Sequence, residues 1–295
     1  MIGINARRGR VLLYVAFASF SLGVQGAGAQ DLSGVTPRFT SAVAFDVSQP
    51  ARDIAPLSAG ARIALPATNA PVDIRPDRGP SVADAGFSGD GTFGQAVSTS
   101  VKKMAENFAN FEGLSNQDNF NLLGFRVNPP DPVGDVGLGH YVEMLNLAVA
   151  VYDKAGNLVM GPLAIGDLWA GFAVEDCTDP SGDPIVVYDQ LVNRWILSQF
   201  TTRFTNDPQN DQFYNCVAVS KTPDPTGEYY RYAFPSGNFF PDYPKYGVWT
   251  DSYILTSRDF GPMVEYGISI YALEKAKMIS GNPGARAVQF FLDSD

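Results

Sequence analysis

A repeat of 54 to 58 residues constrains the fold of this chain more than any other feature of its sequence. Strand-like segments that begin with an aromatic residue follow polar turns at Tyr141, Trp195 and Tyr253. The segments "VGDV", "PIVVYD" and "YGVWTD" precede them, and one or two further strand patterns follow each. Blades of a β-propeller repeat with a similar period. We therefore predict an all-β, propeller-like domain of repeated four-stranded meanders, with the aromatic residues packed between blades.

The turns between these strands support the same fold class. Gly156 permits a positive φ in the turn of "VYDKAGNLV", and Pro225 and Gly227 mark a similar turn further along the chain. The one helical candidate is Leu273 to Ser280, which Gly281 follows. About three repeat units fit into the chain, whereas propellers have four to eight blades, so we expect an incomplete ring.

The N-terminal 29 residues have the layout of an export signal. Three arginines at positions 7, 8 and 10 precede the apolar run 11–24, and the small residues "AGA" end at Ala29. The apolar run is shorter than a membrane span, so we expect cleavage before Gln30 and no membrane span afterwards. The mature protein is then secreted, periplasmic or held in the cell envelope of a bacterium.

Residues 30–104 differ in composition from the rest of the chain. The stretch 37–100 contains no Lys, Trp, Tyr or Cys and is rich in Ala, Pro, Gly and Ser. We predict a low-complexity leader or linker here that is extended and partly disordered, in which short pieces such as "ARIAL" add a strand to a sheet edge. The propeller-like domain is assigned to residues 105–295.

The net charge bears on the choice of partner. Removing the three arginines of the signal moves the formal charge from −10 to −13. Nucleic-acid binding needs clustered Lys and Arg, so we do not expect a nucleic-acid partner. A glycan or an extracellular protein fits this acidic chain better.

The two cysteines, Cys177 and Cys216, predict one disulfide. An even pair is typical of exported proteins, and the single histidine of the chain makes a zinc site a poor alternative. Closing a loop of this size stabilises the fold by about 3 to 4 kcal/mol in the chain-entropy description.

The segments "PPDPVGDVGLGHYVEML", "GDPIVVYDQLVNRWILSQF" and "FPDYPKYGVWTDSYILTSRDF" resemble a group of bacterial secreted proteins with a propeller-like repeat domain and no assigned activity. The resemblance covers residues 105–295 and implies the fold and export, but no reaction. Members of the group have Asn at the position of Val133. If that loop binds a cation in them, one oxygen ligand is missing here.

Aspartates recur beside the first strand of each repeat. In a propeller, such carboxylates could converge near the axis on a sugar or a cation, and a pair of them is what glycoside hydrolysis needs. The alternative is that they cap turns. Asp135, Asp183 and Glu175 are the catalytic candidates. The wider set comprises Asp131, Asp135, Asp183, Asp189, Asp242 and Asp251.

Glu175 to Cys177 and Asp183-Pro184 are similar to dipeptides of five-bladed glycosidases that act on fructans and arabinans, but here they occur in the opposite order. His140 is a candidate general base, with a turn histidine as the alternative, because no nucleophile motif accompanies it.

A metal site is a further hypothesis. Asp131, Asp135 and the carbonyl groups around Gly134 offer the oxygen ligands that Ca²⁺ prefers, with a plain Asx turn as the alternative. We expect no other cofactor.

The aromatic segment "NFFPDYP" and a nearby tryptophan are the predicted binding surface. Exposed rings could form a platform for a carbohydrate or a partner protein, whereas most rings in such a repeat belong to the core. The predicted binding residues are Phe239, Phe240, Asp242, Tyr243 and Trp249.

Two functions remain open from the sequence. The first is a secreted, non-catalytic binding or scaffold module that engages a glycan or a protein through loops on one face of the propeller. The alternative is a carbohydrate-active enzyme, either a glycoside hydrolase or a lyase, with carboxylates around the axis.

Overall fold

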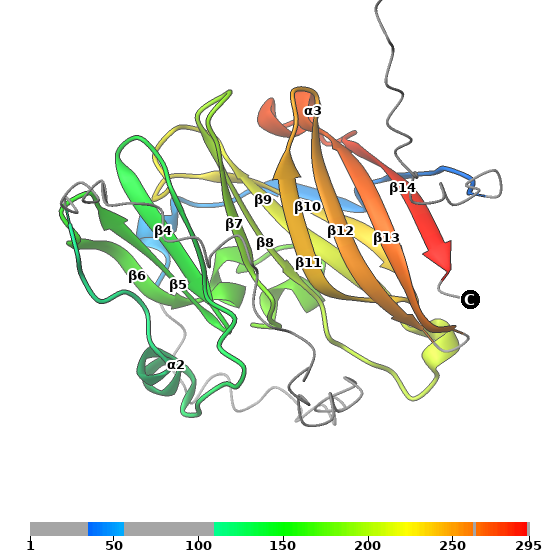
Figure 1. Cartoon of the computed structure of the whole chain (residues 1–295), viewed down its shortest axis with the longest axis horizontal. Coiled ribbons are helices and arrows are strands. Elements are labelled where there is room, and N and C mark those ends of the chain that lie inside the picture. The colour runs from blue at the N-terminus through cyan, green and yellow to red at the C-terminus, as the bar shows by residue number, and fades with distance from the viewer. Residues whose placement is uncertain (1–34, 56–108, 262–263, 294–295) are drawn as a thin grey trace, which may run out of the picture. The chain divides into compact units, whose positions relative to one another are not determined.

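The strands form three antiparallel sheets, each built on a meander of four strands that are consecutive in the chain (Figure 1). The computed structural model describes residues 35–55, 109–261 and 264–293. Blade 1 consists of β3 (Val133–Val136), β4 (His140–Leu145), β5 (Ala148–Asp153) and β6 (Leu158–Ala164). Blade 2 consists of β7 (Ile185–Asp189), β8 (Arg194–Phe200), β9 (Phe213–Ser220) and β10 (Tyr229–Gly237). Blade 3 consists of β11 (Phe240–Val248), β12 (Ser252–Gly261), β13 (Val264–Glu274) and β14 (Arg286–Asp293).

The predicted all-β fold of four-stranded meanders is thus confirmed, with three such sheets in the described residues. The turn between β5 and β6 shows why the strands form where the sequence predicts them. Asp153 Oδ1 accepts hydrogen bonds from the backbone N–H groups of Ala155 (2.8 Å) and Asn157 (2.9 Å). Gly156 adopts φ 88°, a conformation that favours glycine.

The first strand of each blade is the innermost one. β3 contacts β7, and β7 contacts β11, so these three strands lie next to one another. Each begins near an X-Pro step and ends in a hairpin to the second strand of its blade. We call these two ends of the inner strands the proline end and the hairpin end. The forward face of a blade is the one turned toward the next blade in the chain, and the backward face is turned toward the preceding one.

Two hydrophobic cores join the blades. The first lies between the forward face of blade 1 and the backward face of blade 2, and includes Val142, Met144, Val149, Trp195, Leu197 and Ala218. The second lies between blades 2 and 3, and includes Ile196, Val217, Val219, Tyr232, Phe234, Tyr253, Leu255, Tyr271 and Leu273.

Trp195 and Tyr253 lie between blades, as predicted for the aromatic residues. A Cβ added to Gly137 of blade 1 would lie 2.5 Å from the Trp195 ring, so the indole packs directly on this glycine. Tyr253 donates its hydroxyl to Asp189 of blade 2 (3.0 Å). Tyr141 instead packs on the backward face of blade 1, against Phe111 (6.1 Å between centroids).

Two short pieces of the predicted leader, residues 30–104, add strands to sheet edges, as expected for this stretch, although neither is the piece "ARIAL" that the sequence singled out. β1 (Arg38–Ser41) pairs with β14, and β2 (Ala44–Val47) pairs with β10, so each adds a fifth, outermost strand. Arg231 of β10 donates two hydrogen bonds to Asp46 (2.8 and 2.7 Å). Segments of four residues are ordered here because their backbone groups complete two existing sheet edges.

The remaining elements are short. The predicted helix within residues 273–280 is present as α3, and a second helix, α2, precedes blade 1. These elements are α2 (Asn116–Leu123), α3 (Lys275–Ile279) and the 3₁₀ turns η1 (Ala51–Asp53), η2 (Ile165–Trp169), η3 (Glu175–Thr178) and η4 (Pro208–Asn210). Among the described residues, the helices are too short or too polar to cross a membrane. The predicted signal, residues 1–29, and the fragment "ARIAL" lie outside the described residues.

Candidate functional site

The proline end brings one unusual residue from each blade to the start of the inner strands. Asp131 (φ 36°) and Asp183 (φ 38°) precede Pro132 and Pro184, directly before β3 and β7. Tyr243 (φ 53°) precedes a proline at a bulge in β11. A following proline disfavours the helical region, and a positive φ is costly for residues other than glycine. The same strained step therefore recurs in all three blades.

Hydrogen bonds link these three residues across the blades. The side chain of Asn146, at the turn between β4 and β5, donates to Asp131 Oδ2 (2.9 Å) and accepts the backbone N–H of Asp183 (2.8 Å). Asp183 Oδ2 in turn accepts the backbone N–H of Tyr243 (3.1 Å). Of the predicted aspartates, Asp131, Asp183 and Asp242 are thus brought together.

The carboxyl group of Asp183 is the most perturbed group of this cluster. Burial raises its pKa to about 6, and the charges of Asp242 and Asp131 and a hydrogen bond with Asp131 act in the same direction. Glycosidase carboxyl groups stand about 5 to 10 Å apart, so Asp131 and Asp183 are too close to act as such a pair.

The other predicted aspartates have structural partners. Asp135 accepts the backbone N–H of Tyr188 in blade 2 (2.7 Å) and that of Val136 (2.7 Å). Asp251 accepts the hydroxyl hydrogen bond of Ser252 (3.0 Å). Asp135 therefore ties β3 to the end of β7, and Asp251 makes a local hydrogen bond within its own hairpin. Both contacts fit the turn chemistry that the sequence left open as the alternative.

Asp131 and Asp135 do not share one environment. Asp131 lies at the proline end, whereas Asp135 bonds to the backbone near the hairpin end of β7. Four residues of extended chain span roughly 13 Å. In the part of the chain that the structure describes, no group of three or more His, Cys, Asp or Glu side chains is arranged to hold a metal ion.

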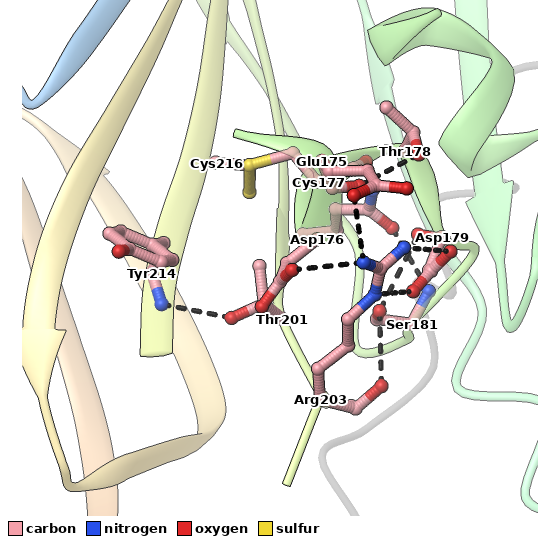
Figure 2. The surroundings of a disulfide bond; sticks show 12 residues. Glu175, Asp176, Cys177, Thr178, Asp179, Ser181, Thr201, Arg203, Tyr214 and Cys216 are labelled. Carbon is pink, nitrogen blue, oxygen red and sulfur yellow. Dashed lines mark hydrogen bonds and ion pairs between the residues drawn. A yellow bond between two sulfur atoms is a disulfide. The ribbon is translucent and has the colours of Figure 1, made fainter. Parts of the chain in front are cut away.

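Glu175 belongs to an ion-pair cluster beside the disulfide (Figure 2). Arg203 donates two hydrogen bonds to Asp179 (2.6 and 3.2 Å), and its Nη1 lies 3.4 Å from both Glu175 and Asp176. The Glu175 side chain is 80% exposed. Glu175 thus takes part in a surface ion pair that fixes the loop after blade 1. These contacts are not those of a buried general acid.

The predicted disulfide between Cys177 and Cys216 is confirmed, with the two Cα atoms 6.0 Å apart. It connects η3 to β9, and both cysteines are fully buried in the core between blades 1 and 2. Gln199 of β8 donates a hydrogen bond to the Cys177 carbonyl group (2.6 Å). The long connection between the two blades is thus fixed to the sheet at its middle.

The predicted aromatic binding residues are divided between the two ends. Phe240 packs among Phe200, Phe204 and Phe213, with ring centroids 5.0 to 5.6 Å apart, and Phe239 stacks on Phe291. Tyr243 is 54% exposed at the proline end, where Lys245 Nζ lies 3.6 Å from its ring centre.

Trp249 is 64% exposed and lies at the hairpin end, beside a cavity of about 250 Å³. The hairpins of blades 2 and 3 form this cavity together. It is lined by Tyr188, Gln190, Leu191, Val248, Trp249 and Thr250. These six side chains include two aromatic rings, an amide and hydroxyl groups, and none carries a charge. Another cavity of about 250 Å³, between η1 and β6, has no aromatic residue in its lining.

A buried ion pair, which sequence reasoning did not find, holds both hairpins of the Trp249 cavity. Asp189 Oδ2 lies 2.6 Å from Lys275 Nζ, and both side chains are almost fully buried. Asp189 Oδ1 accepts the backbone N–H of Leu191 (3.0 Å), while Lys275 donates to the Trp249 carbonyl group (2.9 Å). The sequence "YD" at the end of β7 was the feature that could have drawn attention to Asp189. No sequence pattern near Lys275 identifies this lysine as its partner.

His140 begins β4 and pairs in register with Asp153 of β5. It lies at the strand end beside the turn between β3 and β4, a position that fits the turn histidine given as the alternative.

Comparison with known proteins adds no identification, since no protein-family model, no curated protein and no solved structure matches the chain.

Proposed function

We propose that this protein is a non-catalytic binding module that engages an uncharged glycan through the Trp249 cavity. The observation that carries the proposal is the exposed indole of Trp249 beside a cavity of about 250 Å³, on loops that come from two neighbouring blades. Small-molecule sites are concave, with aromatic walls and a few polar groups that fix orientation.

The chemistry of the lining favours a sugar ring. A pyranose has an apolar C–H face that packs on an aromatic ring and hydroxyl groups that need donors and acceptors around its rim. Trp249 and Tyr188 supply rings, and Gln190 and Thr250 supply an amide and a hydroxyl group. Without a charged group in the lining, an uncharged sugar fits better than a uronic acid or an amino sugar, whose charge would lack a partner.

The cavity loops are held in place before any ligand arrives. Asp189 fixes the blade 2 hairpin, and Lys275 fixes the carbonyl group of Trp249. Tyr188 donates its hydroxyl to Asn193 Oδ1 (2.5 Å), which orients a second ring of the lining. Preorganised loops lose little conformational entropy on binding, and this favours affinity.

The alternative, a carbohydrate-active enzyme, depends on the proline end. A carboxyl group with a pKa of about 6, such as that of Asp183, is suited to general acid chemistry at mildly acidic pH. Its contact with Asp131 argues against this role, because water or a sugar ring needs space between the two groups. We therefore rank binding before hydrolysis.

We also propose that the protein is exported, as the predicted signal and the resemblance to bacterial secreted proteins indicate. The disulfide is compatible with an oxidising compartment.

The test is binding of the purified mature protein to a panel of insoluble and soluble neutral polysaccharides, followed by calorimetry on the best ligand. Trp249→Ala should weaken binding at least about tenfold, corresponding to about 1.4 kcal/mol. Phe125→Ala, at another exposed aromatic residue (53% exposed), is the matched control and should leave affinity unchanged. Loss of binding in Tyr243→Ala, with Trp249→Ala unaffected, would move the site to the proline end.

Release of reducing sugars separates the two functions. We expect none from the wild-type protein on the same panel. Turnover that disappears in Asp183→Asn, while binding persists, would establish the enzyme instead.

A further inference from the structure

Asp189 and Lys275 bring a carboxyl group and an amine into contact inside the protein. Asp189 Oδ2 lies 2.6 Å from Lys275 Nζ, the Asp189 side chain is fully buried and that of Lys275 is 3% exposed. The two residues lie at the end of β7 and the start of α3, so only the folded chain joins them. Unlike the guanidinium group of arginine, which stays charged, a lysine amine can act as a nucleophile.

The surrounding groups hold the amine and the carboxyl group in place. Lys275 Nζ donates a hydrogen bond to the Trp249 carbonyl group (2.9 Å) and lies 5.4 Å from the centre of the Tyr253 ring. Asp189 Oδ1 accepts the backbone N–H of Leu191 (3.0 Å). Well-oriented groups within one molecule react with effective molarities of about 10⁵ to 10⁸ M, which favours a bond between them.

The two oxygen atoms of the Asp189 carboxyl group have different partners, and each partner suits one role in a condensation. Oδ1 faces the Leu191 N–H, a donor that stabilises negative charge on this oxygen when an amine attacks the carboxyl carbon. Oδ2 faces Lys275 Nζ and also accepts the Tyr253 hydroxyl group (3.0 Å). The Tyr253 hydroxyl group is thus placed to pass a proton to the oxygen that has to leave as water.

We propose that Lys275 and Asp189 form an intramolecular isopeptide bond after the chain has folded. One ammonium proton first passes to Asp189 Oδ2, directly or through Tyr253, and frees the nitrogen lone pair. Lys275 Nζ then attacks Asp189 Cγ, an N–C bond forms, and the bond between Cγ and Oδ2 breaks. One proton stays on the amide nitrogen, and the other two ammonium protons leave with Oδ2 as water. Tyr253 ends unchanged, and the step needs no oxidant, reductant or further reactant.

Burial favours the amide over the unreacted pair. The step replaces two buried charges with one neutral group, and buried charges are costly. Because both side chains are closed off from bulk water, the reverse reaction, hydrolysis, is also disfavoured. Lys221 and Glu228 provide a contrast, since their charged groups lie 2.9 Å apart but their side chains are 29% and 44% exposed. We expect no bond in that pair.

The bond would join β7 of blade 2 covalently to α3, beside the two hairpins that line the Trp249 cavity. A second cross-link would restrict the unfolded chain in addition to the disulfide. The chemistry of the step does not depend on which ligand the cavity binds.

The test is mass spectrometry of the purified mature protein after unfolding and reduction. Stability is not the readout, because removing either partner also leaves a buried charge. We expect an intact mass that is one water molecule below the value for the sequence. Trypsin should leave the chain uncut after Lys275 and release a branched peptide that joins the segments containing Asp189 and Lys275. In the same digest, the chain should be cut after Lys221 as after an ordinary lysine.

Two variants identify the reacting groups. Lys275→Arg keeps the positive charge but cannot form this amide, so it should have the full mass. Tyr253→Phe keeps the ring and removes the hydroxyl group, so the bond should form about a hundredfold more slowly in freshly refolded protein. A rate equal to that of the wild-type protein would overturn the role of Tyr253.

The proposal is overturned if the wild-type protein keeps its full mass after prolonged incubation in the folded state, a result that does not depend on whether any variant folds. A loss of water that persists in Lys275→Arg would also overturn it, because that loss would come from an aspartate that cyclises with its own backbone.

Discussion

Asp189 of blade 2 and Lys275 of α3 form a buried ion pair, 2.6 Å between Oδ2 and Nζ, that joins two blades and anchors the two hairpins of the Trp249 cavity. Removing one partner of such a pair leaves an uncompensated buried charge. Asp189→Ala should therefore destabilise the protein by about 3 to 5 kcal/mol, as measured by urea unfolding.

A double replacement separates the net contribution of the ion pair to stability from the penalty of leaving one buried charge unpaired. Asp189→Leu combined with Lys275→Met removes both charges, and its stability should lie closer to the wild-type value than that of either single variant. Asp251→Asn, at an exposed aspartate in a neighbouring hairpin, should change stability by less than about 0.5 kcal/mol. If the double variant is as unstable as Asp189→Ala, the pair contributes through its hydrogen bonds rather than through its charges.

Gly137→Ala tests the contact between blades 1 and 2. The new methyl group would lie 2.5 Å from the Trp195 ring, which is buried and has little room to move. Overpacking of this kind costs about 1 to 3 kcal/mol. Gly139→Ala, two residues further on, meets no atom within 4 Å and should be close to neutral. Equal unfolding midpoints for the two variants would contradict direct packing of the Trp195 indole on Gly137.

Asp259→Asn should alter how stability depends on pH. Burial raises the pKa of Asp259 to about 6, although Ser257 and Ser269 donate hydrogen bonds that lower it. The unfolded group titrates near 3.8, so the folded protein binds the proton more tightly. Protonation of Asp259 therefore stabilises the folded protein. This contribution to the free energy of unfolding is fully present below pH 4 and is lost as the pH rises through about 6.

Asparagine at position 259 does not titrate, so the stability of Asp259→Asn relative to the wild-type protein should rise between pH 4 and pH 7. The difference in free energy of unfolding between the two proteins should change by up to about 3 kcal/mol over this range. Urea midpoints of both proteins at pH 4, 5, 6 and 7 measure this change. A constant difference across that range would show that Asp259 titrates normally in the folded state.

Cys177→Ser with Cys216→Ser should lower the free energy of unfolding by about 3 to 4 kcal/mol, because the cross-link no longer restricts the unfolded chain. Reduction of the wild-type protein should give a loss of the same size. Since Arg203 and Asp179 hold the same loop, we expect the double serine variant to keep the native far-UV circular dichroism spectrum.

Much of the fold was predictable because its determinants are local. The repeat period, the Gly156 turn and the aromatic residues at the start of β8 and β12 act within a few residues of the chain. β1 and β2 were not predictable in this way. Each has only four residues in a Pro- and Ala-rich stretch, and each is a strand because of a partner far along the sequence.

The candidate site was predictable only in part. Recurrent aspartates indicated a convergence near the axis, and Asp131, Asp183 and Asp242 do lie together. The pattern could not show which end of an inner strand each aspartate occupies. Asp135 and Asp189 face backbone amides and a lysine instead, and Trp249 lies at the opposite end from Tyr243.

The outermost strands also bear on the order in which the molecule folds. Arg38 of β1 pairs with Gln289 of β14, and β2, two residues further along, pairs with β10. Contacts between such distant segments close large loops and form late. During synthesis, β1 has no partner until β14 has been made, so one of the earliest segments of the domain to be translated is among the last to reach its native place.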